Sequence, residues 1–240
     1  MTVEKPLHGN DPLSGYWLDL GLGPYAPAFQ RQEQVLAARI AGRLPSAVIL
    51  QENWPVFTIG RAGSRTNILA SPQELDRLGI EVLDVNRGGD ITYHGPGQLV
   101  ASPLLYLGDI GLNANQYLHR LEDVLIELLA GYGVQTVKKP HYPGVWLDEE
   151  KIAAVGIAVR HGYTFHGFSL NVSLDLTPFG LINPCGVPQM PVTSLHQVLG
   201  KSVPMSGVKQ KLRVILQNTF GLSLRDVTWS ELQHLGQLAP

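Results

Sequence analysis

Cysteine is almost absent from the sequence, since Cys185 is the only one among 240 residues. A single cysteine excludes an intrachain disulfide, and it excludes a zinc site built from several thiolates. Because stable disulfides belong to oxidising compartments, their exclusion suits the reducing cytoplasm, where we expect the protein to act.

Long runs of basic or apolar residues are also missing. Charged residues make up 16% of the chain, the formal net charge is -2, and the longest basic run is the pair Lys138 and Lys139. This pattern does not support a nucleic-acid groove or a polybasic membrane patch. No apolar run reaches the ~18 residues of a membrane span. We therefore expect neither nucleic acid nor membrane among the partners.

Glycine, by contrast, is concentrated in one stretch. Residues 87–100 read Arg-Gly-Gly-Asp-Ile-Thr-Tyr-His-Gly-Pro-Gly-Gln-Leu-Val. Glycine lets a backbone approach a ligand closely and adopt φ > 0, and the polar side chains between the glycines can fix a polar fragment. The stretch is therefore typical of a binding loop. It is neither a Walker loop nor a dinucleotide fingerprint, because Gly-Lys-Ser/Thr and Gly-x-Gly-x-x-Gly are both missing.

Apolar periodicity predicts the elements of the fold. Helices are expected at 29–44, 72–78, 115–130 and 206–220, and strands at 16–22, 47–50, 56–59, 80–85, 99–106, 151–160 and 163–172. Ser71, Pro72 and Gly79 suit the cap, first position and end of the second helix. His161 and Gly162 suit a tight hairpin turn. Because strands and helices do not alternate strictly, we predict an α+β fold and not a doubly wound one.

The chain shows no internal repeat, low-complexity tract or long linker, so we expect a single domain. Residues 1–15 are polar, contain two prolines and lack the pattern of a signal peptide, which predicts a flexible N-terminal segment. We expect the main domain at 16–221. Residues 222–240 are expected to form a C-terminal extension of that domain.

Cys185 has two possible roles. Free cysteine is most often a small buried hydrophobic residue. Here, however, Pro184 and Gly186 flank it and predict a turn, which would expose the sulfur and bring backbone N–H groups near it as an oxyanion site. A buried cysteine and a nucleophile are both consistent with this context.

A nucleophilic cysteine needs a partner that lowers its pKa from about 8.5. The candidate histidines are His94, His141, His166 and His196. The other candidate is Lys151, which opens an apolar strand and could hold its ammonium near buried surface. Periodicity alone favours the plainer alternative, a lysine that ends a strand in water. The sequence shows no Gly-x-Ser-x-Gly elbow and no metal-ligand spacing around His94 or His166.

Four segments together resemble the octanoyltransferases of lipoate biosynthesis, the lipoyl(octanoyl) transferase (LipB) family. They are residues 55–61 (Pro-Val-Phe-Thr-Ile-Gly-Arg), residues 87–99, residues 151–156 with 166–171, and residues 184–186 with 192–195. They follow one another in the family's order. One departure is Asn53, which stands where many members have histidine, and this puts in doubt any role of that histidine here.

The resemblance implies the fold of biotin and lipoate protein ligases, a mixed β-sheet flanked by helices that is related to class II aminoacyl-tRNA synthetases. It implies transfer of an octanoyl group from octanoyl-acyl carrier protein to a specific lysine of lipoyl domains, the first step of endogenous protein lipoylation. Acceptors would be the lipoyl domains of 2-oxoacid dehydrogenase complexes and the glycine cleavage H protein. We expect no cofactor, no metal and a monomer.

The resemblance also implies roles for particular residues. Cys185 would hold the acyl group as a thioester, and Lys151 would lower the pKa of the thiol and shuttle protons. The substrate-binding residues would be Arg87, Gly88, Gly89, Asp90, Ile91, Thr92, Tyr93, His94, Ala154, Val155, Gly156, Gly167, Phe168 and Ser169.

Three rival functions differ in chemistry. A lipoate or octanoate protein ligase of the same fold would use ATP and an acyl-adenylate, and it needs no nucleophilic cysteine. A non-catalytic module would bind the acyl group or its carrier protein without Cys185 and Lys151. A cysteine hydrolase would release free octanoate and leave the acceptor unmodified.

Overall fold

The computed structural model describes residues 11–239. An eight-stranded sheet has the order β11-β1-β2-β6-β10-β9-β8-β7, and a three-stranded sheet has the order β4-β3-β5. The large sheet is mixed, because β1 runs parallel to β2 and β11 whereas β6, β8, β9 and β10 pair antiparallel. The predicted α+β fold with a mixed sheet is confirmed.

The elements lie along the chain as follows. The strands are β1 (Leu13–Gly23), β2 (Ser46–Asn53), β3 (Val56–Ile59), β4 (Glu81–Asp84), β5 (Ile91–His94), β6 (Gln98–Leu104), β7 (Val137–Lys138), β8 (Gly144–Leu147), β9 (Glu150–Arg160), β10 (Tyr163–Asn171) and β11 (Leu222–Asp226). The helices are α1 (Tyr25–Ile40), α2 (Pro72–Leu78), α3 (Ala114–Ala130), α4 (Leu195–Leu199), α5 (Met205–Phe220) and α6 (Trp229–Gly236). Three short 3₁₀ turns are η1 (Arg65–Asn67), η2 (Thr177–Leu181) and η3 (Pro184–Gly186).

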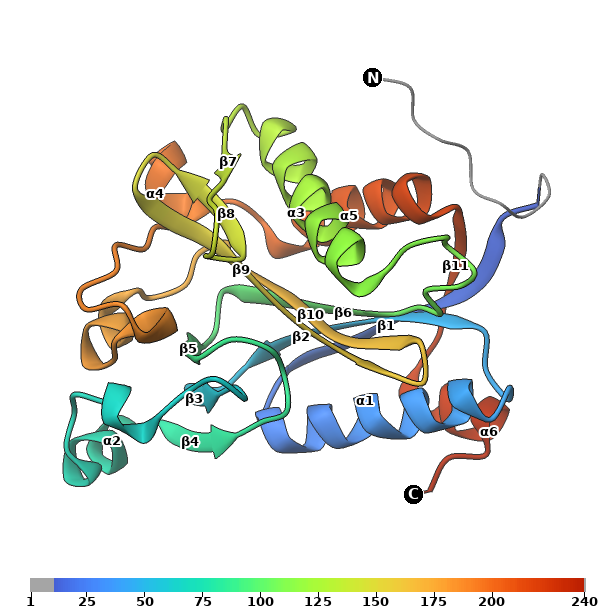
Figure 1. Cartoon of the computed structure of the whole chain (residues 1–240), viewed down its shortest axis with the longest axis horizontal. Helices are drawn as coiled ribbons and strands as arrows, with labels where there is room; N and C mark the ends of the chain where they lie inside the picture. The colour runs from blue at the N-terminus through green and yellow to red at the C-terminus, as the bar shows by residue number, and fades with distance from the viewer. Residues whose placement is uncertain (1–10, 240) are drawn as a thin grey trace.

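Helices cover both faces of the large sheet (Figure 1). The leucines of α3 and α5 pack on one face in the largest buried cluster. On the other face, α1 and α6 pack against β1 and β2. A third cluster lies between the small sheet and η2. The site described below lies where the two sheets and the N-terminal end of α1 meet, so residues from distant parts of the chain form its walls.

Short sequence patterns predicted the ends and turns of several elements correctly. Ser71 caps α2 by accepting a hydrogen bond from the Glu74 N–H, and Gly79 ends the helix at a φ of 65°. At the β9–β10 hairpin, His161 and Gly162 both have positive φ, as a two-residue turn between twisted strands requires. These features depend on a few consecutive residues, which is why the sequence predicts them.

Elements that depend on distant pairing differ from the prediction. β1 begins at Leu13, three residues before the predicted start, because Leu13 pairs with Leu222 of β11. Residues 13–15 are therefore strand and not flexible, while residues 1–10 of the predicted flexible segment lie outside the described residues. The boundary between a domain at 16–221 and an extension at 222–240 stays a prediction.

Two further differences concern the region of the site. The glycine-rich stretch was expected to be a loop, but its residues 91–94 form β5 and pair antiparallel with β3. The short strands β7 and β8 were not predicted, and they join the large sheet at its edge through β9. In the part of the chain that the structure describes, no helix has the length and apolar composition to cross a membrane.

Candidate active site

A cavity of about 430 Å³ lies between the glycine-rich stretch, α1, β9 and β10. This volume falls within the ~300–1,000 Å³ typical of small-molecule sites. Phe29, Leu118, Val155, Ile157 and Phe168 give it apolar walls, and Cys185 and Lys151 both line it. The cavity therefore combines an apolar space with a thiol and an amine.

All but one of the predicted binding residues line this cavity. The exception is Tyr93, which packs edge-on against Phe57 and Phe179 at ring distances of 5.8 and 5.7 Å. The different position of Tyr93 has a simple reason, because successive side chains of a strand point to opposite faces. In β5, Thr92 and His94 face the cavity while Tyr93 enters the third buried cluster.

Cys185 lies in the short turn η3, half-buried on the cavity wall. Its φ is 56° and that of Gly186 is 71°, so two consecutive residues occupy the left-handed region. Such a backbone is uncommon for a residue with a side chain. Within this turn Gly186 N–H donates to Asn183 O and Val187 N–H to Pro184 O, and the expectation that the turn supplies oxyanion donors stays a prediction.

Lys151 is buried, and its Nζ lies 3.4 Å from Cys185 Sγ. The segment after Cys185 holds the lysine backbone, because Lys151 N–H donates to Pro191 O at 2.9 Å and Thr193 N–H donates to Lys151 O at 3.0 Å. The alternative of a lysine that ends a strand in water is wrong. The contact places an amine directly beside the thiol on the cavity wall.

Among the hydrogen bonds of the described residues, none joins Cys185 Sγ to one of the four candidate histidines. His94 contacts Gln98 Oε1 at 2.6 Å and Thr58 Oγ1 at 3.2 Å. His166 contacts Asn86 Oδ1 at 2.7 Å and stacks on a phenylalanine of α1. His141 is exposed at the cavity, and His196 is exposed and contacts Lys201 O at 3.0 Å.

Arg87 places a buried positive charge beside the cavity. Its Nη2 donates to Thr58 O at 2.6 Å and to Thr58 Oγ1 at 2.9 Å, and its Nη1 donates to Gly88 O at 3.0 Å. Burial lowers the pKa of the Arg87 guanidinium from its usual value, and the ring hydroxyl of Tyr25 opposes that shift.

Burial and this charge keep two histidines neutral. Burial first, and then Arg87, lower the pKa of His94 to about 4. Burial, Arg87, His94 and Arg61 lower the pKa of His166 to about 3. Both imidazoles are therefore uncharged near neutral pH, and they serve as polar wall groups and not as cations.

A buried chain of amides connects His94 to the lysine strand. Gln98 Nε2 donates to Asn171 Oδ1 at 2.9 Å, and Asn171 Nδ2 donates to Thr193 O at 2.9 Å. Thr193 in turn donates to the carbonyl of Lys151. No role for Gln98, Asn171 or Thr193 is evident from the sequence, although all three lie in segments that carry the family resemblance.

Helix α1 supplies cavity residues that the sequence analysis missed. They are Tyr25, Phe29 and Gln32, which are aromatic or polar residues on the first turns of the helix. Gln32 Oε1 accepts the His166 N–H at 2.7 Å, and Gln32 Nε2 donates to Ser102 Oγ at 2.8 Å. Gln32 thus joins α1 to β10 and β6.

Asn53 does not line the cavity. It is buried, and its Oδ1 accepts a hydrogen bond from Gln51 Nε2 at 2.8 Å. Its Nδ2 has no hydrogen-bond partner among the described residues.

Acidification is expected to destabilise the fold through the two buried histidines. Their folded-state pKa values lie below the unfolded value of 6.5, so the unfolded chain takes up protons first. Their stabilising contribution is complete above pH ~6.5 and is lost as the pH falls toward 4 and 3. Urea unfolding at pH 7.5 and 5.0 should show a loss on the order of 2 kcal/mol per histidine.

The variant His166→Gln is expected to lose less stability between these two pH values than the original chain. His196→Gln is the matched control because His196 is exposed, and its pH dependence should follow that of the original chain. An equal pH dependence in all three proteins would contradict the assignment to His166.

The chain is similar to known proteins over most of its length. Residues 24–217 match the family model of the lipoyl protein ligase A/B catalytic domain. An octanoyltransferase of Geobacter metallireducens is 44% identical over 194 residues, which covers 81% of this chain and 88% of the relative. A lipoate-protein ligase A solved with bound ATP has a TM-score of 0.72 at 16% identity and covers 94% of this chain and 93% of that one. A biotin protein ligase of Aquifex aeolicus with biotin and ATP has a TM-score of 0.53 at 17% identity and covers 86% and 70%.

Proposed function

Because this chain belongs to the lipoyl protein ligase A/B catalytic-domain family and is an octanoyltransferase of lipoate biosynthesis, we propose that Cys185 carries the octanoyl group as a thioester. Lys151 is its proton-transfer partner. The observation that supports this assignment most directly is the distance of 3.4 Å between Lys151 Nζ and Cys185 Sγ, on the wall of the apolar cavity.

The first half-reaction loads the enzyme from octanoyl-acyl carrier protein. The Cys185 thiolate attacks the thioester carbonyl of the donor, and the carrier thiolate leaves. The Lys151 ammonium gives its proton to that leaving group as a general acid. One thioester replaces another, so the step is nearly isoenergetic and needs no ATP. Lys151 is left as a neutral amine beside the new thioester.

The second half-reaction delivers the octanoyl group to the acceptor lysine of a lipoyl domain. An acceptor amine has a reference pKa near 10.4, so it must lose a proton to become a nucleophile. The neutral Lys151 accepts that proton as a general base, and the acceptor nitrogen displaces the Cys185 thiolate. The second proton, which the acceptor nitrogen loses as the amide forms, passes to solvent. An amide is more stable than a thioester, so the step is downhill. The ammonium and thiolate of the resting enzyme are restored.

The cavity fits an aliphatic tail bound to Cys185. Ala154 and Gly156 of β9 leave room beside the strand, and Phe168 and Phe29 cover the space with aromatic rings. Desolvation of the tail against these residues favours binding by about 25 cal/mol per Å² of apolar surface that is buried. We propose that this cavity holds the octanoyl chain.

The partners follow from the same proposal. The donor is octanoyl-acyl carrier protein, and the acceptors are lipoyl domains of 2-oxoacid dehydrogenase complexes and the glycine cleavage H protein. The enzyme acts as a monomer in the cytoplasm, which suits a chain whose only cysteine must stay a free thiol.

An ATP-dependent ligase remains the alternative at the level of the fold. The likeness to the lipoate-protein ligase A solved with ATP, at 16% identity, concerns the fold alone. The paired Cys185 and Lys151 favour the transferase, because a ligase that forms an acyl-adenylate has no need of a thiol at this position.

Intact-protein mass spectrometry tests the proposal. The chain is mixed with octanoyl-acyl carrier protein without ATP, and a lipoyl domain is added afterwards. We expect the enzyme to gain one octanoyl mass and the lipoyl domain then to take it up. If the lipoyl domain gained the octanoyl mass only when octanoate and ATP were supplied, the enzyme would be a ligase. Release of free octanoate would mean a hydrolase, and binding without any mass gain would mean a binding module.

A further inference from the structure

The proposed mechanism creates a hazard inside the enzyme. After the first half-reaction, the neutral Lys151 amine lies next to the sulfur that carries the octanoyl group, since Nζ and Sγ are 3.4 Å apart. Attack of this nitrogen on the thioester carbonyl would form a C–N bond and break the C–S bond. The proton lost by nitrogen would pass to the departing Cys185 sulfur. The product, an octanoyl amide on Lys151, is more stable than the thioester and would end turnover.

Two residues of β8 restrict the Lys151 side chain. The Trp146 ring is buried, and its centroid lies 5.2 Å from Lys151 Nζ, so the ring covers the end of the lysine side chain whether the nitrogen is charged or neutral. The Gly144 backbone lies against the lysine stem, because a Cβ atom there would stand 2.7 Å from Lys151 Cε. Lys139 Nζ also lies over the Trp146 ring, 4.8 Å from its centroid. The same Nζ forms an ion pair with Glu149 Oε2 at 2.6 Å. We call Gly144 and Trp146 the lysine clamp.

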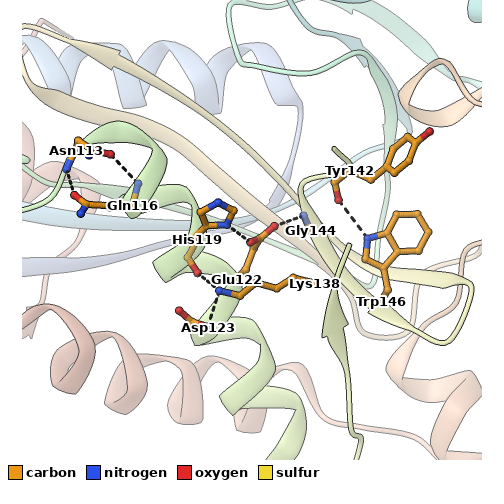
Figure 2. A network of polar contacts seen from close by, with 9 residues as sticks. All are labelled: Asn113, Gln116, His119, Glu122, Asp123, Lys138, Tyr142, Gly144 and Trp146. Carbon is orange, nitrogen blue, oxygen red and sulfur yellow. Dashed lines mark hydrogen bonds and ion pairs between the residues drawn. The ribbon is translucent and has the colours of Figure 1, made fainter. Parts of the chain in front are cut away.

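Helix α3 holds the clamp in place (Figure 2). The buried carboxylate of Glu122 accepts the Gly144 N–H at 2.9 Å and contacts His119 Nδ1 at 2.8 Å. On the neighbouring strand β7, Lys138 pairs with Asp123 of the same helix at 2.7 Å. The proposed mechanism does not use Glu122, although it is a fully buried acid.

Trp146 is further fixed from within its own segment. Its Nε1 donates to the carbonyl of Tyr142 at 3.3 Å, which Figure 2 shows beside the indole. The ring therefore has a hydrogen bond at one edge and the lysine over its face. A ring held in this way leaves a flexible four-carbon lysine stem little freedom to swing.

From these contacts, and resting on the proposed function, we propose that the lysine clamp holds Lys151 Nζ beside the sulfur but off the line of attack on the acyl carbonyl carbon, which is bonded to that sulfur. A bound amine reacts quickly only when it reaches a near-attack geometry, roughly 3–3.5 Å from the carbonyl carbon along the correct direction. Trp146 is thus a positioning residue. It lets Lys151 exchange protons with the reacting groups and prevents the enzyme from acylating itself.

The variant Trp146→Leu tests the proposal because it removes the ring from Lys151. Each protein is loaded from octanoyl-acyl carrier protein without an acceptor, and samples are taken over time. Hydroxylamine cleaves thioesters but not amides, and peptide mass spectrometry then locates any resistant octanoyl group. We expect Trp146→Leu to accumulate a resistant octanoyl group on Lys151 on the order of ten times faster than the original chain.

Matched controls separate the clamp from a general loss of structure. Trp146→Phe keeps a ring over Nζ but loses the hydrogen bond to the Tyr142 carbonyl, so its resistant fraction should lie between those of the original chain and Trp146→Leu. Trp54→Leu removes an exposed tryptophan and should form only the hydroxylamine-sensitive adduct. A hydroxylamine-sensitive adduct in Trp146→Leu without faster modification of Lys151 would overturn the proposal.

A second variant covers the case that Trp146→Leu does not fold. Glu122→Gln removes the buried charge that holds Gly144 and leaves Lys151 and Trp146 unchanged. It should raise the resistant fraction on Lys151 in the same direction, and to a smaller extent. No rise in either variant overturns the clamp. If the original chain itself forms no hydroxylamine-sensitive adduct, the proposed Cys185 thioester fails instead.

Discussion

Replacing Cys185 by alanine should lower octanoyl transfer by about 10⁴-fold or more and should remove the acyl-enzyme from mass spectra. The removal of a nucleophile that forms a covalent intermediate has effects of this size, because the remaining binding groups cannot supply the missing bond. The rate of transfer from octanoyl-acyl carrier protein to a lipoyl domain gives the measurement. Since Cys185 is half-buried in a turn, the fold should tolerate the change.

The folded state of Cys185→Ala is checked by urea unfolding at pH 7.5, where its midpoint should stay close to that of the original chain. Cys185→Ser is the companion variant, since it keeps a hydroxyl of similar size but a far weaker nucleophile at this pH. Transfer by Cys185→Ala at a tenth or more of the original rate would contradict the thioester. If that residual transfer needed ATP, the ligase alternative would take its place.

Replacing Lys151 by methionine should lower transfer by about 10²- to 10⁴-fold, the usual range for removal of a general acid and base. Methionine fills a similar space but carries neither charge nor proton. In the proposed mechanism Lys151, whose Nζ lies 3.4 Å from the sulfur, activates Cys185 as a nucleophile, so alkylation of Cys185 by iodoacetamide at pH 7 should also slow. Both rates are measured on the same protein preparation.

Lys151→Arg separates the two roles of the lysine. Arginine keeps a positive charge beside the thiolate but does not give up its proton in proteins. We expect this variant to keep much of the alkylation rate and to transfer the octanoyl group poorly to the lipoyl domain. If Lys151→Met kept the original rates of transfer and alkylation, the proton role of Lys151 would have to be dropped.

The sequence predicts the parts of this fold that consecutive residues decide. The cap and end of α2, the leucines of α3 and the turn at His161 and Gly162 depend on local preferences for backbone angle, capping and burial. β5 could not be predicted in this way, because its four residues form a strand only through pairing with β3. The same holds for the first residues of β1, which pair with a strand more than 200 residues away.

The same distinction between features of consecutive residues and features of distant pairing applies to the candidate site. The residue types in the glycine-rich stretch, at Lys151 and around Cys185 are visible in the chain, and their order carries the resemblance to octanoyltransferases. The partner of Cys185 could not be chosen from four histidines and a lysine by spacing. Lys151 lies 34 residues from Cys185 along the chain. It comes close to the sulfur because Val192, which follows Cys185, forms a parallel β-bridge with Lys151.

The chemical groups of this protein, its local turns and helices, and the family that it resembles can all be read along the chain. The contact of Lys151 with the sulfur, the turn of Tyr93 away from the cavity, and the places of α1 and Trp146 around the site are visible only in the folded chain. The physical reason is that local preferences act over a few residues, whereas burial and charge pairing act between any groups that the folded chain brings within a few ångströms.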